Sequence, residues 1–181
     1  MRTSFFAAAL LLTSLSTACA FVCATDNGHD SGAKRGARAT AAIESRSGST
    51  LHGKASFTET QGGVLVEIEV HGAPSGWHAV HVHETGDCSA ADGSSAGGHF
   101  NPATKSHGSP HAPEHHAGDL GNLWVDENGV GHHALLMPDL SVQDGPGSVR
   151  GRALIVHAGV DDLVTQPTGN AGGRIGCGVI Q

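Results

Sequence analysis

Short runs of alternating apolar and polar residues recur along the chain from Thr40 onward. The segment Val64–Val70 alternates aliphatic and acidic side chains, as expected of a strand with one buried and one solvated face. Glycine and proline clusters, such as Gly62-Gly63 and residues 145–147, separate the runs and are typical of turns. No long stretch carries an apolar stripe with helical spacing. The pattern predicts strands over residues 40–44, 52–58, 64–70, 78–83, 120–126, 131–136, 150–157 and 176–180.

Eight short strands at fairly regular spacing indicate an all-β fold, an antiparallel sandwich or barrel. Two segments interrupt this rhythm, residues 84–119 and residues 158–175, and both are rich in glycine. The first also contains Cys88 and several histidines. Because a long loop without secondary structure is uncommon in a compact domain, such a loop generally carries a function. We expect the first loop to be held by a disulfide and a metal ion.

The first twenty residues have the features of a signal peptide. Arg2 supplies a short positive region, Phe5–Leu15 is apolar, and Ala18-Cys19-Ala20 is a small-x-small cleavage site. The apolar run is too short to span a membrane. We expect cleavage after Ala20, with cleavage after Ala24 as the alternative. We therefore expect a signal peptide over residues 1–20, a flexible linker over residues 21–39 and one folded domain over residues 40–181.

A lipid anchor at Cys19 is a weaker alternative, because Ser16 stands where a bulky aliphatic residue is preferred. Export to the periplasm or the medium places the chain in an oxidising compartment, where cysteines pair. Four cysteines allow three connectivities. Cys19 and Cys23 lie in or beside the signal peptide, so Cys88 and Cys177 are the pair we expect.

Composition narrows the functional classes. The chain has 10 lysines and arginines against 17 acidic residues, a net charge of -7. An acidic chain lacks the basic surface that neutralises phosphates, which argues against a nucleic-acid partner. The 14 histidines outnumber the lysines and arginines together, and this excess is the feature that most needs an explanation.

The spacing of several histidines suits metal binding. His81 and His83 stand two apart in a predicted strand, so both imidazoles lie on one face of it. A zinc site needs four such ligands, and the long loop supplies a set of three imidazoles and one carboxylate. That set is His99, His107, His116 and Asp119. His157 ends an apolar strand, where an imidazole has no other evident reason to stand.

Two other interpretations compete with a metal site. Gly93-Ser94-Ser95-Ala96-Gly97 fits the G-x-S-x-G pattern of hydrolases, but that motif needs a strand-to-helix turn and no helix is predicted after it. A purely structural sandwich would leave each histidine as an ordinary loop or core residue. That interpretation does not explain why so many histidines occur where a loop must be held.

At these residues the sequence resembles the copper/zinc superoxide dismutase family. The resemblance spans residues 39–181, and the matching stretches occur in the order found in the family. They are HVHETGDC (81–88), GGHFNP (97–102), KSHG (105–108), HHAGDLGN (115–122), LIVHAGVDDL (154–163) and GNAGGRIGCGVI (169–180). The resemblance implies an eight-stranded antiparallel Greek-key barrel of immunoglobulin-like type with two long functional loops.

The resemblance also implies one copper and one zinc ion per chain, bridged by one histidine. The copper ligands it implies are His81, His83, His99 and His157. The zinc ligands it implies are His99, His107, His116 and Asp119.

Further residues match positions around the family's metals. Asp161 matches the aspartate that bonds one ligand histidine from each site, and Arg174 matches the arginine that guides the anion to copper. The pair Cys88–Cys177 matches the family's disulfide, and His78 matches a histidine that bonds the backbone.

The implied activity is dismutation of superoxide to oxygen and hydrogen peroxide, protecting the cell envelope. His99 and Arg174 would then be the catalytic residues. A non-catalytic copper carrier of the same fold is the alternative. The loop after Asp162 is short and uncharged, which resembles the bacterial branch, and relatives there include monomers and homodimers.

Overall fold

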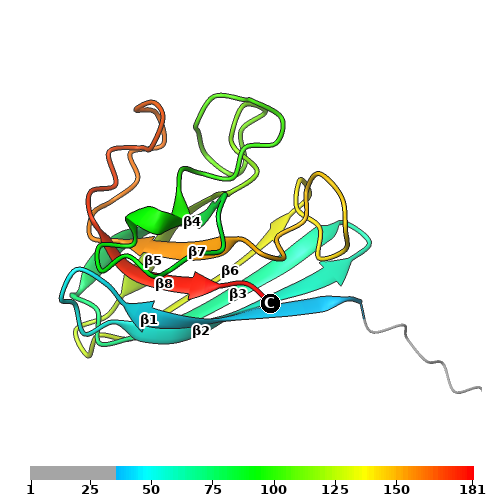
Figure 1. Ribbon diagram of the computed structural model, residues 1–181. Coiled ribbons are helices and arrows are strands. Elements are labelled where there is room, and N and C mark those ends of the chain that lie inside the picture. Colours follow the sequence, from blue (N-terminus) through cyan, green and yellow to red (C-terminus); the bar gives the residue numbers. More distant parts are fainter. Residues whose placement is uncertain (1–35) are drawn as a thin grey trace, which may run out of the picture. The chain divides into compact units, whose positions relative to one another are not determined.

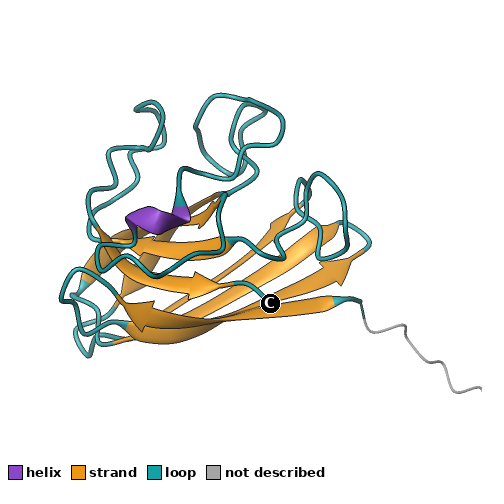
Figure 2. Ribbon diagram, viewed as in Figure 1, coloured by secondary structure: helices purple, strands orange, loops and turns teal. Residues whose placement is uncertain are grey.

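Eight antiparallel strands form a closed barrel in the computed structural model, which describes residues 36–181 (Figure 1 and Figure 2). Around the barrel the order is β1-β2-β3-β6-β5-β4-β7-β8. The strands are β1 (Arg38–Ser45), β2 (His52–Thr60), β3 (Gly63–His71), β4 (Gly76–His83), β5 (Asp119–Val125), β6 (Gly131–Met137), β7 (Ala153–His157) and β8 (Arg174–Val179). A 3-10 turn, η1 (Ser94–Ala96), is the one helical element among these residues. The predicted all-β antiparallel fold is confirmed.

Most strand ends differ from the sequence-based prediction by one to three residues, and two of these differences have a clear cause. β1 begins at Arg38 rather than at residue 40, because Arg38 pairs with Thr58 of β2. β7 begins at Ala153 rather than at residue 150, because Gly151 adopts a φ of 72° that extended strands do not use. The prediction left open a sandwich or a barrel. Pairing of Glu44 in β1 with Cys177 in β8 closes the barrel.

Side chains that alternate along the strands fill the barrel. On β3 the residues Val64, Val66, Ile68 and Val70 are buried, and those between them are half-buried or exposed. β4 and β7 depart from this alternation, because every residue from His78 to His83 and all of β7 is buried. Both faces of these two strands must therefore be covered, the inner one by the core and the outer one by loops.

The covering loops are residues 84–118 and 158–173, which rise on the same side of the barrel, over β4 and β7 (Figure 1). A disulfide joins Cys88 in the first loop to Cys177 in β8, with 5.8 Å between the Cα atoms, as predicted. A crosslink that closes so long a segment stabilises a fold by about 2–5 kcal/mol. Residues 36–181 contain no helix that is long and apolar enough to cross a membrane.

The signal peptide predicted for residues 1–20, its cleavage sites and the lipid-anchor alternative at Cys19 lie outside the described residues, as does the linker up to residue 35.

Candidate metal centre

Strand alternation brings the first histidine group together. Val80 and Val82 of β4 point into the core, so His81 and His83 lie on the outer face beneath the loops. His157 ends the neighbouring strand β7, and His99 arrives from the long loop through a bridge to His83. One ligand atom from each of these four buried histidines lies within 4.8 Å of the others.

A second group lies beside the first and shares His99 with it. The group consists of His99, His107, His116 and Asp119, all buried, with ligand atoms within 4.8 Å of one another. His99 is the one residue that belongs to both groups among those the structure describes. The loop spacing in the sequence predicted this second set, and the structure brings all four of its residues together.

Five ring nitrogens of these groups are buried without a hydrogen-bond partner among residues 36–181. They are His81 Nδ1, His83 Nε2, His99 Nε2, His107 Nδ1 and His157 Nε2. Native proteins rarely leave buried polar atoms unpaired, so five in one place call for a missing partner. One ion bound by the first group would satisfy four of these nitrogens. A second ion, bound by the second group, would satisfy the fifth, His107 Nδ1.

The other nitrogen of each first-group ring is held by an acceptor. His83 Nδ1 donates to the Gly97 carbonyl at 2.9 Å, and His157 Nδ1 donates to the Gly172 carbonyl at 3.2 Å. Because a neutral imidazole donates from only one nitrogen, these bonds leave Nε2 with a free lone pair. The tautomers that metal coordination requires are therefore set by the backbone. Copper and zinc both accept imidazole ligands, and the donor set fits both ions.

Asp161 connects the two groups. Its Oδ2 accepts from His81 Nε2 at 2.8 Å and its Oδ1 accepts from His107 Nε2 at 2.9 Å. Asn122 holds the Asp161 backbone from both sides, at 2.8 and 2.9 Å. Gly169 must be glycine here, because a Cβ at its φ of 65° would stand 1.9 Å from Asp161 Oδ1. One carboxylate thus orients one ring in each group.

Asp119 is surrounded by the second group. Its Oδ1 lies 2.9 Å from His99 Nδ1, 3.0 Å from His107 Nδ1 and 3.3 Å from His116 Nδ1. Its Oδ2 accepts backbone N–H bonds from Gly108 and His116. Burial raises the pKa of Asp119, but the neighbouring His107 and His99 rings and the backbone N–H groups of Gly108 and His116 hold that pKa far below its usual range. The carboxylate is therefore ionised, as a zinc ligand must be.

Burial keeps His81 and His157 of the first group neutral. It lowers the pKa of His81 to about 4, although the Asp161 carboxylate acts in the opposite direction. Burial is the main cause that lowers the pKa of His157 to about 3, and the neighbouring His81 contributes in the same direction. Near neutral pH both rings are unprotonated, which leaves their lone pairs free for a metal.

Arg174 stands next to the first group. Its Nη1 donates to the Gly93 carbonyl and its Nη2 to the Gly97 carbonyl, both at 2.7 Å. The Gly97 carbonyl also accepts from His83, so one carbonyl fixes both the guanidinium and a histidine of the group. Burial lowers the pKa of Arg174 from its usual value. The group nevertheless remains a cation, because an arginine is not deprotonated in proteins.

Sequence reasoning missed two residues that hold the site. Asn122 fastens Asp161, and Gln166 bonds both backbone groups of His107, with Nε2 to the carbonyl and Oε1 to the N–H, each at 2.8 Å. Both partners are distant in sequence, so no local motif marks either residue. His78 bonds the carbonyls of Pro74 and His157, as the resemblance implies.

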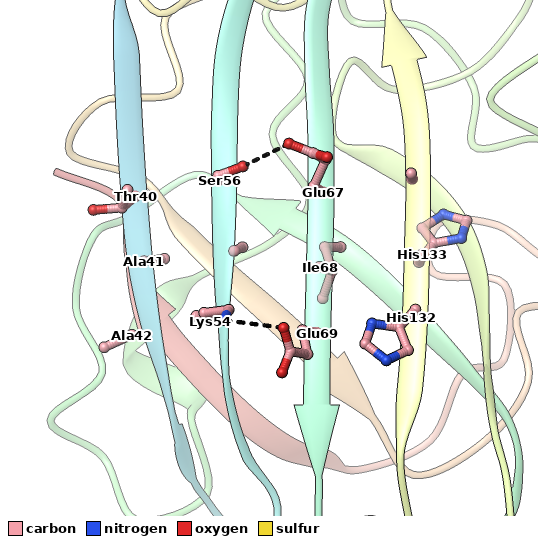
Figure 3. A pocket seen from close by; sticks show the side chains of 12 residues that line it. Thr40, Ala41, Ala42, Lys54, Ser56, Glu67, Ile68, Glu69, His132 and His133 are labelled. Carbon is pink, nitrogen blue, oxygen red and sulfur yellow. Dashed lines mark hydrogen bonds and ion pairs between the residues drawn. The ribbon is translucent and has the colours of Figure 1, made fainter.

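Two further features lie away from the histidine groups. Trp77 and Trp124 form an exposed edge-to-face pair on β4 and β5. A groove of about 750 Å³ on the outside of β1, β2, β3 and β6 is lined in part by His132 and His133 (Figure 3). None of its lining residues belongs to either histidine group, so the groove is separate from the candidate metal centre.

The metal-free protein is expected to lose stability as the pH falls from about 6.5 to about 3. His81 and His157 have folded-state pKa values of about 4 and about 3, below their usual 6.5, so the unfolded chain takes up protons first. Their contribution is fully present above the unfolded value and is lost as the pH falls through the folded values. Urea titrations at a series of pH values measure it. A free energy of unfolding that stays constant across this window would contradict the buried neutral rings.

His107 acts in the opposite direction. Burial lowers its pKa, but the neighbouring carboxylates of Asp119 and Asp161 outweigh burial and raise the pKa to about 9. The contribution of His107 is therefore present below the usual value of 6.5 and is lost as the pH rises through about 9. Above neutral pH the same titrations should show a decline from this group.

Several known proteins are similar to this chain in sequence. A family model described as copper/zinc superoxide dismutase (SODC) matches residues 51–180. The curated superoxide dismutase (Cu-Zn) 2 of Aquifex aeolicus is 41% identical over 136 residues, covering 71% of this chain and 78% of the relative. The superoxide dismutase (Cu-Zn) of Caulobacter vibrioides is 38% identical over 149 residues, covering 79% of this chain and 85% of the relative.

Solved structures agree with the sequence relatives. The clock protein EA4 superposes with a TM-score of 0.73 at 40% identity, covering 81% of this chain and 94% of that one. A double mutant of a SOD-like protein from Bacillus subtilis superposes with a TM-score of 0.69 at 37% identity, covering 77% and 94%. On the fold, the two histidine groups and these matches, the chain belongs to the copper/zinc superoxide dismutase family.

Proposed function

We propose that this chain carries out its family's reaction, the dismutation of superoxide, at the two histidine groups. Copper would be held by His81, His83, His99 and His157. Zinc would be held by His99, His107, His116 and Asp119. The observation that carries the proposal is the set of five buried, unpaired ring nitrogens around His99.

The reaction converts two superoxide anions and two protons into one oxygen molecule and one hydrogen peroxide molecule. Copper supplies reversible one-electron chemistry when bound, and zinc supplies a fixed positive charge. The chain's own residues must bring in the anion, orient the ligands and deliver protons. His99 suits proton delivery, because its Nε2 faces the first group while its Nδ1 stays 2.9 Å from Asp119.

Attraction of the substrate has to be local in an acidic chain. The net charge of -7 repels an anion, so a cation close to copper must offset it. Arg174 is that cation in this proposal. Its guanidinium is permanently charged and forms a fork that matches a small anion. The Gly93 and Gly97 carbonyls fix its direction.

A combined metal analysis and superoxide assay tests the proposal. We expect one copper and one zinc per chain together with fast dismutation. Bound copper without turnover would instead support a non-catalytic copper carrier. A protein that binds neither metal would contradict both functions.

Export belongs to the same proposal and is supported by the bacterial relatives and the disulfide. Under it, residues 1–20 are a signal peptide, the following residues up to the start of β1 at Arg38 are a linker, and the remainder is the enzyme domain, placed in the periplasm or secreted. N-terminal sequencing of the mature protein should find Phe21, or Thr25 for the alternative site. A chain that keeps Met1 or carries a lipid on Cys19 would contradict this part. Sedimentation equilibrium distinguishes a monomer from a homodimer.

A further inference from the structure

Arg46, in the turn after β1, has a largely buried side chain with unusual partners. Its side chain is only 14% exposed, yet its one carboxylate neighbour among the described residues, Glu44, is 3.6 Å away and itself 75% exposed. The short bonds go to backbone carbonyls instead. Nε and Nη2 donate to Cys88 at 3.0 and 2.6 Å, and Nη1 donates to Ser45 at 2.6 Å. An arginine held in this way fixes the direction of a loop rather than neutralising a charge.

The loop that Arg46 holds, residues 87–97, is called the disulfide loop here. It is internally bonded, because Ser95 Oγ donates to the Asp87 carbonyl at 2.9 Å and Gly93 N donates to the Ala90 carbonyl at 2.9 Å. A displacement at Cys88 would therefore be transmitted along the loop. Its far end carries the Gly93 and Gly97 carbonyls that hold Arg174.

Gly93 brings the two arginines together. A Cβ placed on Gly93 would lie 3.4 Å from both Cβ and Cδ of Arg174 and 3.7 Å from Cγ of Arg46. The stems of both arginines thus pack around one loop residue. The turn also reaches β8 directly, because Ser47 Oγ donates to the Arg174 carbonyl at 2.8 Å.

We propose that Arg46 is a positioning residue for the attraction of superoxide, acting through the disulfide loop on the direction of the Arg174 guanidinium. Arg46 binds the Cys88 end of the loop, and Arg174 is bound by its other end. The inference rests on the proposed role of Arg174 in attracting superoxide. It extends that role to Arg46, which lies in the turn after β1. A misplacement of a positioned charge by about 1 Å can change rates strongly.

The first test uses the metal-free protein, so it does not depend on copper or on turnover. Amide hydrogen exchange over residues 87–97 is measured in wild type, Arg46→Gln and Arg46→Lys. Both variants should exchange faster than wild type, because neither side chain can donate two hydrogen bonds to the Cys88 carbonyl as the guanidinium does. Lysine keeps the positive charge, so it separates the loss of these bonds from the loss of charge. Arg150→Gln is the matched control, since Arg150 also bonds two backbone carbonyls, those of Val142 and Arg38. Unchanged exchange in both Arg46 variants would overturn the proposal.

The second test uses the protein loaded with copper and zinc and follows azide binding by absorption. Arg46→Gln and Arg46→Lys should each weaken azide binding by about fivefold, and Arg150→Gln should not. Wild-type affinity in Arg46→Lys alone would mean that only the charge matters, which overturns the positioning role. In an Arg174→Gln background, Arg46→Gln should have no further effect; a full second loss would show independent action and overturn the proposal.

The two tests separate this inference from the proposed function. If wild type binds no copper, the proposed function fails while the exchange test still reports on Arg46. If wild type dismutes superoxide and exchange is unaffected by both Arg46 variants, the inference about Arg46 alone fails.

Discussion

Replacing His99 with alanine is expected to lower the rate of superoxide dismutation by about a hundredfold or more. Loss of a residue that merely supports a ligand costs about 10- to 100-fold in affinity or activity, and His99 itself donates a ligand atom to each ion in the proposed centre. It is also the one described residue that belongs to both groups, so its removal opens both at once. The measurement is the rate of superoxide decay per bound copper.

His111→Ala is the control for this prediction. His111 lies in the same long loop but is exposed and belongs to neither group. This variant should keep wild-type activity and metal content. Near-native dismutation by His99→Ala would show that no ligand is shared and would contradict the proposed centre.

Asp161→Asn is expected to weaken zinc binding by about 10- to 100-fold, with a smaller loss of copper. Asp161 accepts from His107 Nε2 with one oxygen and from His81 Nε2 with the other. Asparagine has a single oxygen, so its amide N–H would face one of the two ring N–H groups. One ring would then lose its orientation. Competition with a chelator of known affinity measures the change.

The neighbouring Asp162→Asn provides the matched control, because it removes the same charge one residue away. Asp162 Oδ1 accepts from the N–H groups of Val164 and Thr165, bonds that an asparagine oxygen can also accept. Zinc affinity should therefore stay near wild type. Equal losses in both variants would point to a general effect of charge and would contradict a specific role for Asp161.

Local sequence patterns predicted the strands well. The alternation in Val64–Val70 identified β3, and the spacing of His99, His107 and His116 in one loop indicated a shared ion. These signals are local, so they can be recognised in the sequence. Closure of the barrel could not be predicted in this way, because it depends on Glu44 pairing with Cys177 far along the chain.

The residues that hold the site were less predictable for the same reason. Asn122 bonds Asp161 and Gln166 bonds His107 across long stretches of sequence. Arg46, in the turn after β1, bonds the carbonyl of Cys88, 42 positions further along the chain. A single polar residue in a turn has many uses, and only the folded chain shows which carbonyl or carboxylate it meets.

Anomalous X-ray diffraction at the copper and zinc absorption edges would locate both ions of the proposed centre. We expect a copper peak among His81 Nδ1, His83 Nε2, His99 Nε2 and His157 Nε2. We expect a zinc peak among His99, His107, His116 and Asp119, with the His99 ring between the two peaks. Two such peaks would establish the paired centre. Metal peaks outside both groups, or one peak with the other group empty in a protein of full activity, would contradict it.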